Sequence, residues 1–179
     1  MSRLFAYISL LFTFSPPAAL PALDVSGKAS LQDGSVSLDI SVYQFPDEEI
    51  LKALSSGHRS EITYNVRIDK NVGFWRRLTG KGNSYEVSQN YNIRWDPLQS
   101  TFVIESGNAT FFEEFSSDLI ELLRNPPPFI IKMDQSDMTG IDLSVKVDLI
   151  KKKLYPPLNI LSILIFDLKD STEWRGIKI

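Results

Sequence analysis

The chain contains no cysteine and only one histidine, His58. Without cysteine there can be no disulfide framework, no thiolate nucleophile and no anchor through a lipidated cysteine. A zinc site built on histidines is also excluded, and no serine lies in a G-x-S-x-G motif. His58 follows Gly57 at the expected end of a helix, where a turn or surface role is the simplest interpretation. We therefore expect a protein that is not an enzyme and that uses no metal or cofactor.

Basic residues do not outnumber acidic ones, since the net charge is −3. The charge becomes one unit more negative when Arg3 is removed with the leader described below. A nucleic-acid-binding domain would need a basic surface, so we expect no nucleic-acid partner. If the leader described below directs export, a domain without disulfides suits the bacterial envelope better than the exterior of a eukaryotic cell.

The first 22 residues, MSRLFAYISLLFTFSPPAALPA, have the layout of a secretory signal peptide. Arg3 precedes an apolar run, Leu4 to Phe14, and a segment of small residues and prolines follows. We expect cleavage after Ala22, with cleavage after Ala19 or an uncleaved anchor as alternatives. Residues 23–179 would then form a single β-rich domain in the periplasm or another extracytoplasmic space.

Alternating apolar residues predict strands at the start of this domain. Val36, Leu38, Ile40 and Val42 share one face of a strand, and Asp33-Gly34 before them is typical of a hairpin turn. The period then changes to that of a short helix over residues 46–57. Pro46 suits its first turn and Gly57 the position after its last turn.

Two longer strands follow, over residues 62–68 and 85–95. Their apolar sets are expected to face inward: Ile62, Tyr64, Val66 and Ile68 on the first strand, and Tyr85, Val87, Tyr91, Ile93 and Trp95 on the second. Antiparallel pairing with both sets inward allows two registers. One places Arg67 opposite Glu86 and the other places Glu61 opposite Arg94, so each predicts a cross-strand ion pair.

The stretch NYNIRWDPLQSTF, residues 90–102, packs Arg94, Trp95 and Asp96 together and raises the question of a site. Asp96-Pro97 has the residues of a tight turn, and Phe102 follows on the returning strand. We interpret the stretch as a hairpin corner on whose two arms Trp95 and Phe102 pack together, in preference to a binding site.

The next segment predicts a helix over residues 111–124. Thr110 and Glu113 have capping-box spacing, and the apolar residues that follow have a helical period: Phe112, Phe115, Leu119, Leu122 and Leu123. We expect these side chains to be the core face of the helix. Strands at 129–133, 141–150 and 174–179 complete the pattern.

Together these elements predict a mainly β (α+β) fold with about eight strands and two short helices. We expect an antiparallel β-sandwich or a strongly curved sheet, with the helices packed on an open face or end.

Four segments together resemble an uncharacterised bacterial exported family, domain of unknown function 4390: ILKALSSG before a strand, WDPLQSTFVI, FFEEFSSDLIELL, and a proline-led apolar segment with a late tryptophan. The resemblance covers most of the chain after the leader. It implies a single β-rich envelope domain, in some bacteria encoded near sensor histidine kinases. It implies no catalytic residues and no reaction.

Two segments remain as candidate sites. The polar turn with Asp134, Ser136, Asp137 and Asp142 does not match the calcium-loop spacing, so we expect no metal there.

The connection over residues 71–84 is long and basic in an acidic protein, and carries Phe74, Trp75, Arg76, Arg77 and Lys81. Tryptophan and arginine are enriched in interface hot spots. The same residues could touch anionic lipid headgroups, or the aromatic rings could simply cap the end of the sandwich.

The leading functional hypothesis is a non-catalytic envelope domain that uses this loop to bind another envelope or membrane protein, such as a membrane-bound sensor. The alternative is a periplasmic carrier of a small apolar ligand or lipid, which a poorly filled space between the helix and the sheet would favour. The sequence leaves the oligomeric state open.

Overall fold

The computed structural model describes residues 23–32, 34–70, 84–132, 141–153 and 168–177. Within these ranges the chain forms ten strands and two helices. Their bounds are β1 (Asp24–Gln32), β2 (Ser35–Tyr43), α1 (Asp47–Ser55), β3 (Arg59–Lys70), β4 (Ser84–Asp96), β5 (Thr101–Ser106), β6 (Ala109–Glu113), α3 (Ser116–Arg124), β7 (Phe129–Lys132), β8 (Ile141–Lys153), β9 (Lys169–Ser171) and β10 (Arg175–Ile177).

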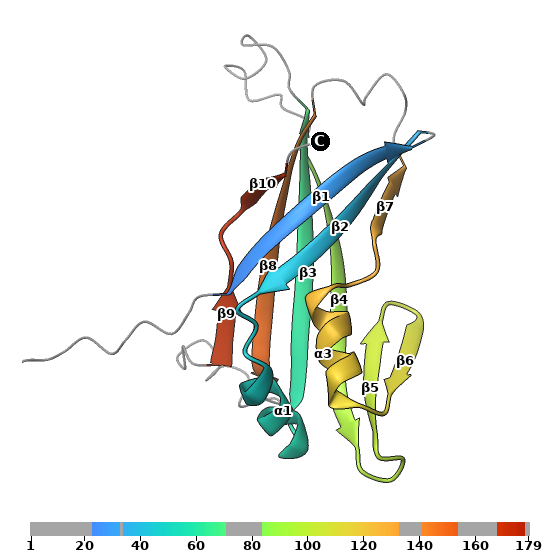
Figure 1. Cartoon of the computed structure of the whole chain (residues 1–179), viewed down its shortest axis with the longest axis vertical. Helices are drawn as coiled ribbons and strands as arrows, with labels where there is room; N and C mark the ends of the chain where they lie inside the picture. The colour runs from blue at the N-terminus through green and yellow to red at the C-terminus, as the bar shows by residue number, and fades with distance from the viewer. Residues whose placement is uncertain (1–22, 33, 71–83, 133–140, 154–167, 178–179) are drawn as a thin grey trace, which may run out of the picture.

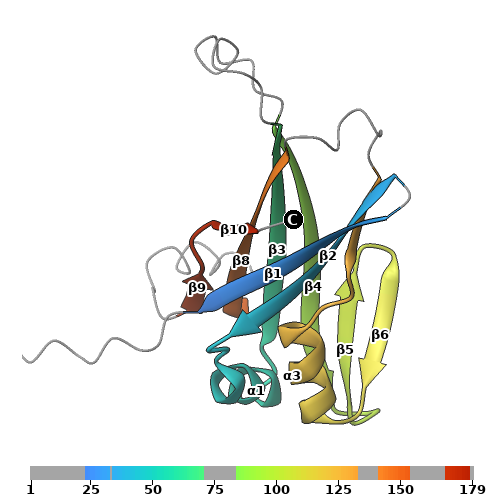
Figure 2. The same ribbon diagram turned by 45° about the horizontal axis from the view of Figure 1, so that its top comes forward.

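The strands form two antiparallel sheets. A small sheet has the order β1-β2-β7, and a larger one has the order β10-β8-β3-β4-β5-β6, with β9 also paired to β8. The β1–β2 ribbon crosses the larger sheet diagonally, and α1 and α3 lie beside its lower end (Figures 1 and 2). The predicted mainly β fold, sandwich-like with two helices, is confirmed.

The core lies between the larger sheet and this cover of ribbon and helices. Val36, Leu38, Ile40 and Val42 of β2 are buried, as their alternation predicted, and β1 and β2 pair as the predicted hairpin, with Gln32 opposite Ser35. The apolar faces of β3 and β8 meet them from the other side, through Ile62, Tyr64, Val66, Ile68, Leu143, Val145, Val147 and Leu149. The period-two pattern therefore sets which face of each strand is apolar, and packing brings those faces together.

The pairing of β3 with β4 selects one of the two predicted registers. Arg67 lies opposite Glu86, with Nη2 and Oε2 3.7 Å apart. The alternative is wrong, because Glu61 lies opposite Asn92 and forms its ion pair with Lys153 of β8. Arg94 instead pairs with Asp96 and Glu105.

The prediction that the apolar side chains of β4 face the core holds only for part of the strand. Tyr91 and Ile93 are buried, but Tyr85 and Val87 are exposed. The reason is the short reach of β5, which pairs with β4 only over Asn92–Asp96. Among the described residues, the first half of β4 is therefore an edge of the sheet.

The first helix agrees with its sequence signals. It spans Asp47–Ser55, with Pro46 at the N-cap, one position before the expected first turn. Gly57 has a φ of 79° just beyond the helix, a conformation that glycine adopts without strain.

The second predicted helix begins too early in the sequence. Residues 109–113 are strand β6, and α3 starts only at Ser116, after the N-cap Phe115. The predicted capping box of Thr110 and Glu113 is wrong, because both residues lie in strand β6. Phe112 and Phe115, assigned to the core, are 58% and 64% exposed. A turn at Gly107-Asn108 folds the chain back onto β5, so that backbone pairing replaces the helical path.

The three lysines at the end of β8, residues 151–153, do not share one surface. The pairing of β3 with β8 is irregular between Arg59 and Glu61, where β8 has one extra residue. Beyond this bulge, the side chains of β8 point to the opposite face from the one that strict alternation would give. Lys151 is buried and meets Glu49 and Asp170, whereas Lys153 meets Glu61 on the outer face. Near this end β9 is an additional strand that the sequence did not predict, and β10 confirms the last predicted strand.

No helix within the described ranges is long and apolar enough to cross a membrane.

Candidate functional site

The residues predicted to bind a partner lie outside the described part of the chain. Phe74, Trp75, Arg76, Arg77 and Lys81 all belong to residues 71–83. The polar turn from Asp134 to Gly140 lies outside it as well. Among the residues that the structure does describe, no group of three or more His, Cys, Asp or Glu side chains could hold a metal ion.

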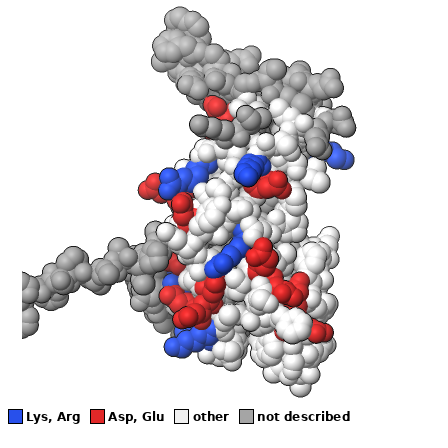
Figure 3. Space-filling view, viewed as in Figure 1, with Lys and Arg blue, Asp and Glu red and all other residues white. Residues whose placement is uncertain are grey.

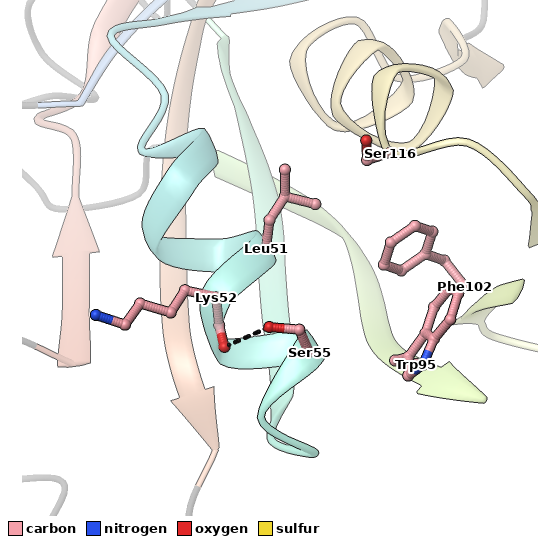
Figure 4. Close-up of a pocket in the computed structure, with 6 residues that line it drawn as sticks. All are labelled: Leu51, Lys52, Ser55, Trp95, Phe102 and Ser116. Atoms are coloured by element: carbon pink, nitrogen blue, oxygen red, sulfur yellow. Dashed lines mark hydrogen bonds between the residues drawn. The ribbon is translucent and has the colours of Figure 1, made fainter. Parts of the chain in front are cut away.

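An open apolar groove lies between the two helices and the β4–β5 hairpin (Figure 4). Its volume is about 410 Å³. Its lining comes from three places, namely α1, the hairpin and the start of α3, through Leu51, Lys52, Ser55, Trp95, Phe102 and Ser116. Residues from distant parts of the sequence thus form one apolar surface.

The predicted hairpin corner supplies the two aromatic rings of this groove. Trp95 and Phe102 are cross-strand partners, with ring centroids 4.7 Å apart and an angle of 57° between the planes. Asp96 holds the turn, because its Oδ1 accepts hydrogen bonds from the amides of Leu98 (3.0 Å) and Gln99 (3.4 Å). The predicted hairpin corner is confirmed. The same corner also lines the groove, so a hairpin corner and a candidate binding site do not exclude each other here.

Helix α1 forms the opposite wall. Ile50, Ala53 and Leu54 are buried and fix the helix on the sheet, while Leu51 points into the space between the helices (Figure 4). Lys52 carries its ammonium group away from the rings (Figure 4). The hydroxyl of Ser55 donates to the carbonyl of Lys52 at 3.1 Å, so it is already satisfied. The groove therefore offers apolar contact and few free polar groups.

Helix α3 is held in place by two polar contacts. The hydroxyl of Tyr64 on β3 donates to the carbonyl of Leu123. Burial, and next the neighbouring Tyr91, raise the pKa of Tyr64 well above its usual value, so the hydroxyl stays protonated as a donor. At the end of the helix, Arg124 pairs with Asp47 at the start of α1, with Nη2 and Oδ2 2.5 Å apart. This ion pair joins the end of one helix beside the groove to the start of the other.

Exposed aromatic side chains occur close to the groove in the sequence, on β6 and at the start of α3. Phe111 is 42% exposed and belongs with Phe112 to the edge strand β6, and Phe115 immediately precedes the groove residue Ser116. At the tip of the hairpin, Leu98 is exposed as well. Sequence reasoning missed these residues as surface features because it placed Phe112 and Phe115 on a helix. The Gly107-Asn108 turn signal could have shown the hairpin.

The same region is acidic. Residues 97–123 contain no lysine and no arginine, and their charged residues are Glu105, Glu113, Glu114, Asp118 and Glu121. Acidic atoms are visible on the side of the molecule that carries α3 and the β5–β6 hairpin (Figure 3). A partner that contacts β6 or the start of α3 would meet exposed aromatic rings beside the carboxylates of Glu113, Glu114 and Asp118.

The single histidine takes no part in the groove. The amide of His58 donates to the carbonyl of Ala53 at 3.0 Å, as part of the end of α1. Its predicted place in the turn after the helix is confirmed.

In comparisons with known proteins, the chain matches no family model, no curated protein and no solved structure.

Proposed function

We propose that this chain is an exported, non-catalytic protein-binding domain of the bacterial cell envelope, and that the apolar groove is its main docking surface. The observation that carries the proposal is the open groove between α1 and the hairpin, lined by Leu51, Trp95 and Phe102. Aromatic residues are enriched in the buried centres of protein interfaces, and tryptophan is enriched among the residues that contribute most to binding.

The shape of the groove supports a protein partner over a small ligand. Small-molecule sites bury most of their ligand, whereas this groove is open and would leave much of a ligand in water. The space beneath α3 is filled, because Leu119 and Leu123 are buried there and Tyr64 packs edge-to-face against Phe129 at 6.3 Å. A carrier of a small apolar ligand or lipid remains the second candidate, since the groove volume lies in the range of ligand sites.

The partner proposed is an envelope or membrane protein. A membrane-bound sensor is the partner that the family resemblance suggests. The loop from Phe74 to Lys81 stays a second predicted contact.

The proposal is tested by photo-crosslinking in intact cells. A photoreactive amino acid at Ser55, in the groove, is compared with the same residue at the exposed Ser26 on β1. We expect a protein adduct at Ser55 that is absent at Ser26 and is lost when Leu51→Glu places a charge in the groove. Circular dichroism and thermal unfolding of the Leu51→Glu variant check that it folds.

Two outcomes contradict the proposal. One is the same set of adducts at both positions, or no protein adduct at Ser55. The other is a lipid that copurifies with the native domain and is lost with Leu51→Glu, which would establish the carrier.

A further inference from the structure

Strand β6 is an open edge of the larger sheet. Within the described part of the chain it pairs only with β5, and it lies at the outer edge in both ribbon views (Figures 1 and 2). An open edge presents unpaired backbone donors and acceptors, on which another strand can add.

The turn of the hairpin decides which groups point outward. Ser106 and Ala109 flank the two-residue turn Gly107-Asn108, and Gly107 has a φ of 57°. The residues that flank such a turn form a hydrogen-bonded pair, and the pairs then alternate along the ladder. Thr110 and Phe112 therefore direct their amide and carbonyl groups away from β5. The open edge offers these groups to an incoming strand.

This edge lacks the protection that the edge strands β1, β7, β9 and β10 carry. Natural edge strands are shielded by prolines, by lysines, by bulges or by being very short. Strand β7 ends at Lys132 and follows three prolines, β1 carries Lys28 near its middle, and β9 and β10 have three residues each. The centre of β6 is Thr110, Phe111 and Phe112. Nothing in it opposes the addition of a strand.

Both faces of β6 offer apolar contact to such a strand. Phe111 lies opposite Ile104 and Phe112 opposite Val103, and both partners on β5 are buried. Since neighbouring residues of a strand point to opposite faces, each phenylalanine extends an apolar surface on a different side of the sheet. An added strand would cover both rings.

Charge selects the chemistry of the partner. Residues 97–123 carry five acidic side chains and no basic one. A second copy pairing through β6 would bring two such regions together, and like charges across an interface are unfavourable. A segment with lysine or arginine would instead gain from the negative field.

We propose that the open edge of β6 binds an extended segment of a partner protein by strand addition. The segment has an apolar, β-branched or aromatic centre flanked by lysine or arginine. Its backbone pairs with Thr110 and Phe112, and its side chains cover Phe111 and Phe112. This inference rests on the proposed protein-binding function and names a recognition mode for it on a surface separate from the groove.

The test uses the full chain and a defined probe, a labelled ten-residue peptide with a Val-Thr-Ile-Val centre and two lysines at each end. Thr110→Pro removes an outward donor while leaving the β5–β6 ladder its hydrogen bonds. Phe112→Lys removes an aromatic ring from the edge and places on the protein a positive charge, which repels the lysines of the peptide. The matched control is Ile130→Lys, the same kind of change at an exposed position on edge strand β7.

Affinity is measured by fluorescence anisotropy, and amide protection of Thr110 and Phe112 by NMR hydrogen exchange. Each β6 variant should bind the peptide at least about tenfold more weakly, while Ile130→Lys binds as the native protein does. A peptide with glutamates in place of the lysines, and one with N-methylated alternate amides, should also bind at least about tenfold more weakly.

Several results would overturn the inference: no binding of the lysine peptide, equal binding of the acidic or N-methylated peptide, unchanged exchange at Thr110 and Phe112, or a concentration-dependent dimer that Phe112→Lys dissolves. The groove variant Leu51→Glu separates the two proposals. If it loses its cellular partner while peptide binding to β6 is absent, the proposed function stands and strand addition fails.

Discussion

The hydroxyl of Tyr64, at the centre of the larger sheet, donates a hydrogen bond to the backbone carbonyl of Leu123 in the last turn of α3. Carbonyls in the last turn of a helix have no partner within the helix. The ring of Tyr64 is fully buried and packs edge-to-face on Tyr91, with centroids 5.8 Å apart. One side chain therefore joins the core of the sheet to the helix beside the groove.

Replacing Tyr64 by Phe should loosen this helix without changing the core volume. The buried carbonyl of Leu123 loses its donor, so we expect a loss of about 1–2 kcal/mol in the free energy of unfolding. Urea denaturation measures the loss, and hydrogen exchange should quicken in α3. The control is Tyr43→Phe, which removes an exposed hydroxyl that accepts from Ser26 at 3.3 Å. Equal losses for the two variants would contradict the role of Tyr64.

The free energy of unfolding at acid pH should depend on the carboxyl group of Glu61. Burial by itself would raise the pKa of this carboxyl, but hydrogen bonds from Lys153 and Asn90 and the charge of Lys153 outweigh it, and the pKa is lowered from 4.5. A lowered folded-state pKa gives stability that is present above the unfolded value and is lost as the pH falls through the folded value.

In Glu61→Gln this contribution is gone at every pH. We therefore expect the variant to be less stable than the native protein at neutral pH, and the difference to shrink as the pH falls below 4.5. Lys153→Met should weaken the same pH dependence, because it removes the main cause of the lowered pKa. Urea denaturation at a series of pH values tests both variants. A difference that stays constant down to strongly acid pH would show that Glu61 is not linked to folding.

The packing of β1 against β10 should show up as coupling between Gly27 and Ile177. A Cβ at Gly27 would lie 2.6 Å from Cδ1 of Ile177, closer than packed atoms approach. Gly27→Ala should therefore destabilise the protein by about 1–3 kcal/mol. Ile177→Val removes Cδ1, so the double variant should lose less than the sum of the single losses by at least about 0.5 kcal/mol. Additive losses in urea denaturation would mean that the two positions do not meet.

The hairpin corner should depend on the carboxylate of Asp96. Asp96→Ala leaves the amides of Leu98 and Gln99 without their acceptor, and we expect a loss of about 1 kcal/mol. Asp96→Asn keeps an acceptor oxygen and should lose less stability than Asp96→Ala.

In the same turn, Ser100 has a φ of 53°, a conformation that strains residues that carry a Cβ. Ser100→Gly should therefore be tolerated without loss of stability. Thermal and urea unfolding compare the three variants, and a loss for Ser100→Gly larger than for Asp96→Ala would refute this account.

Local chemistry predicted much of the fold. Alternation identified the buried faces of β2 and β3, Asp33-Gly34 identified the first hairpin, and Asp96-Pro97 identified the corner with its aromatic pair. Each of these depends on neighbours in the sequence, through backbone geometry or period-two facing. The sequence limited the β3–β4 register to two choices, and the Arg67–Glu86 pair shows which one is formed.

The second helix shows where local patterns fail. The stretch from Thr110 to Leu123 fits a helical period, yet its first part is strand β6 because β5 lies beside it and offers backbone partners. Short apolar runs fit either period, and only the neighbouring strand decides between them. The exposed rings of Phe111 and Phe112, and with them the open edge, depend on that choice.

The sequence by itself determined a mainly β, acidic chain without cysteine, and which residues of each strand belong to the core. These follow from composition and from the direction in which successive side chains point. Only the tertiary structure decided the groove and the open edge. Leu51, Trp95, Phe102 and Ser116 meet because the two helices lie beside the β4–β5 hairpin of the larger sheet. Such contacts join residues far apart in the chain, and no local pattern encodes which of them will meet.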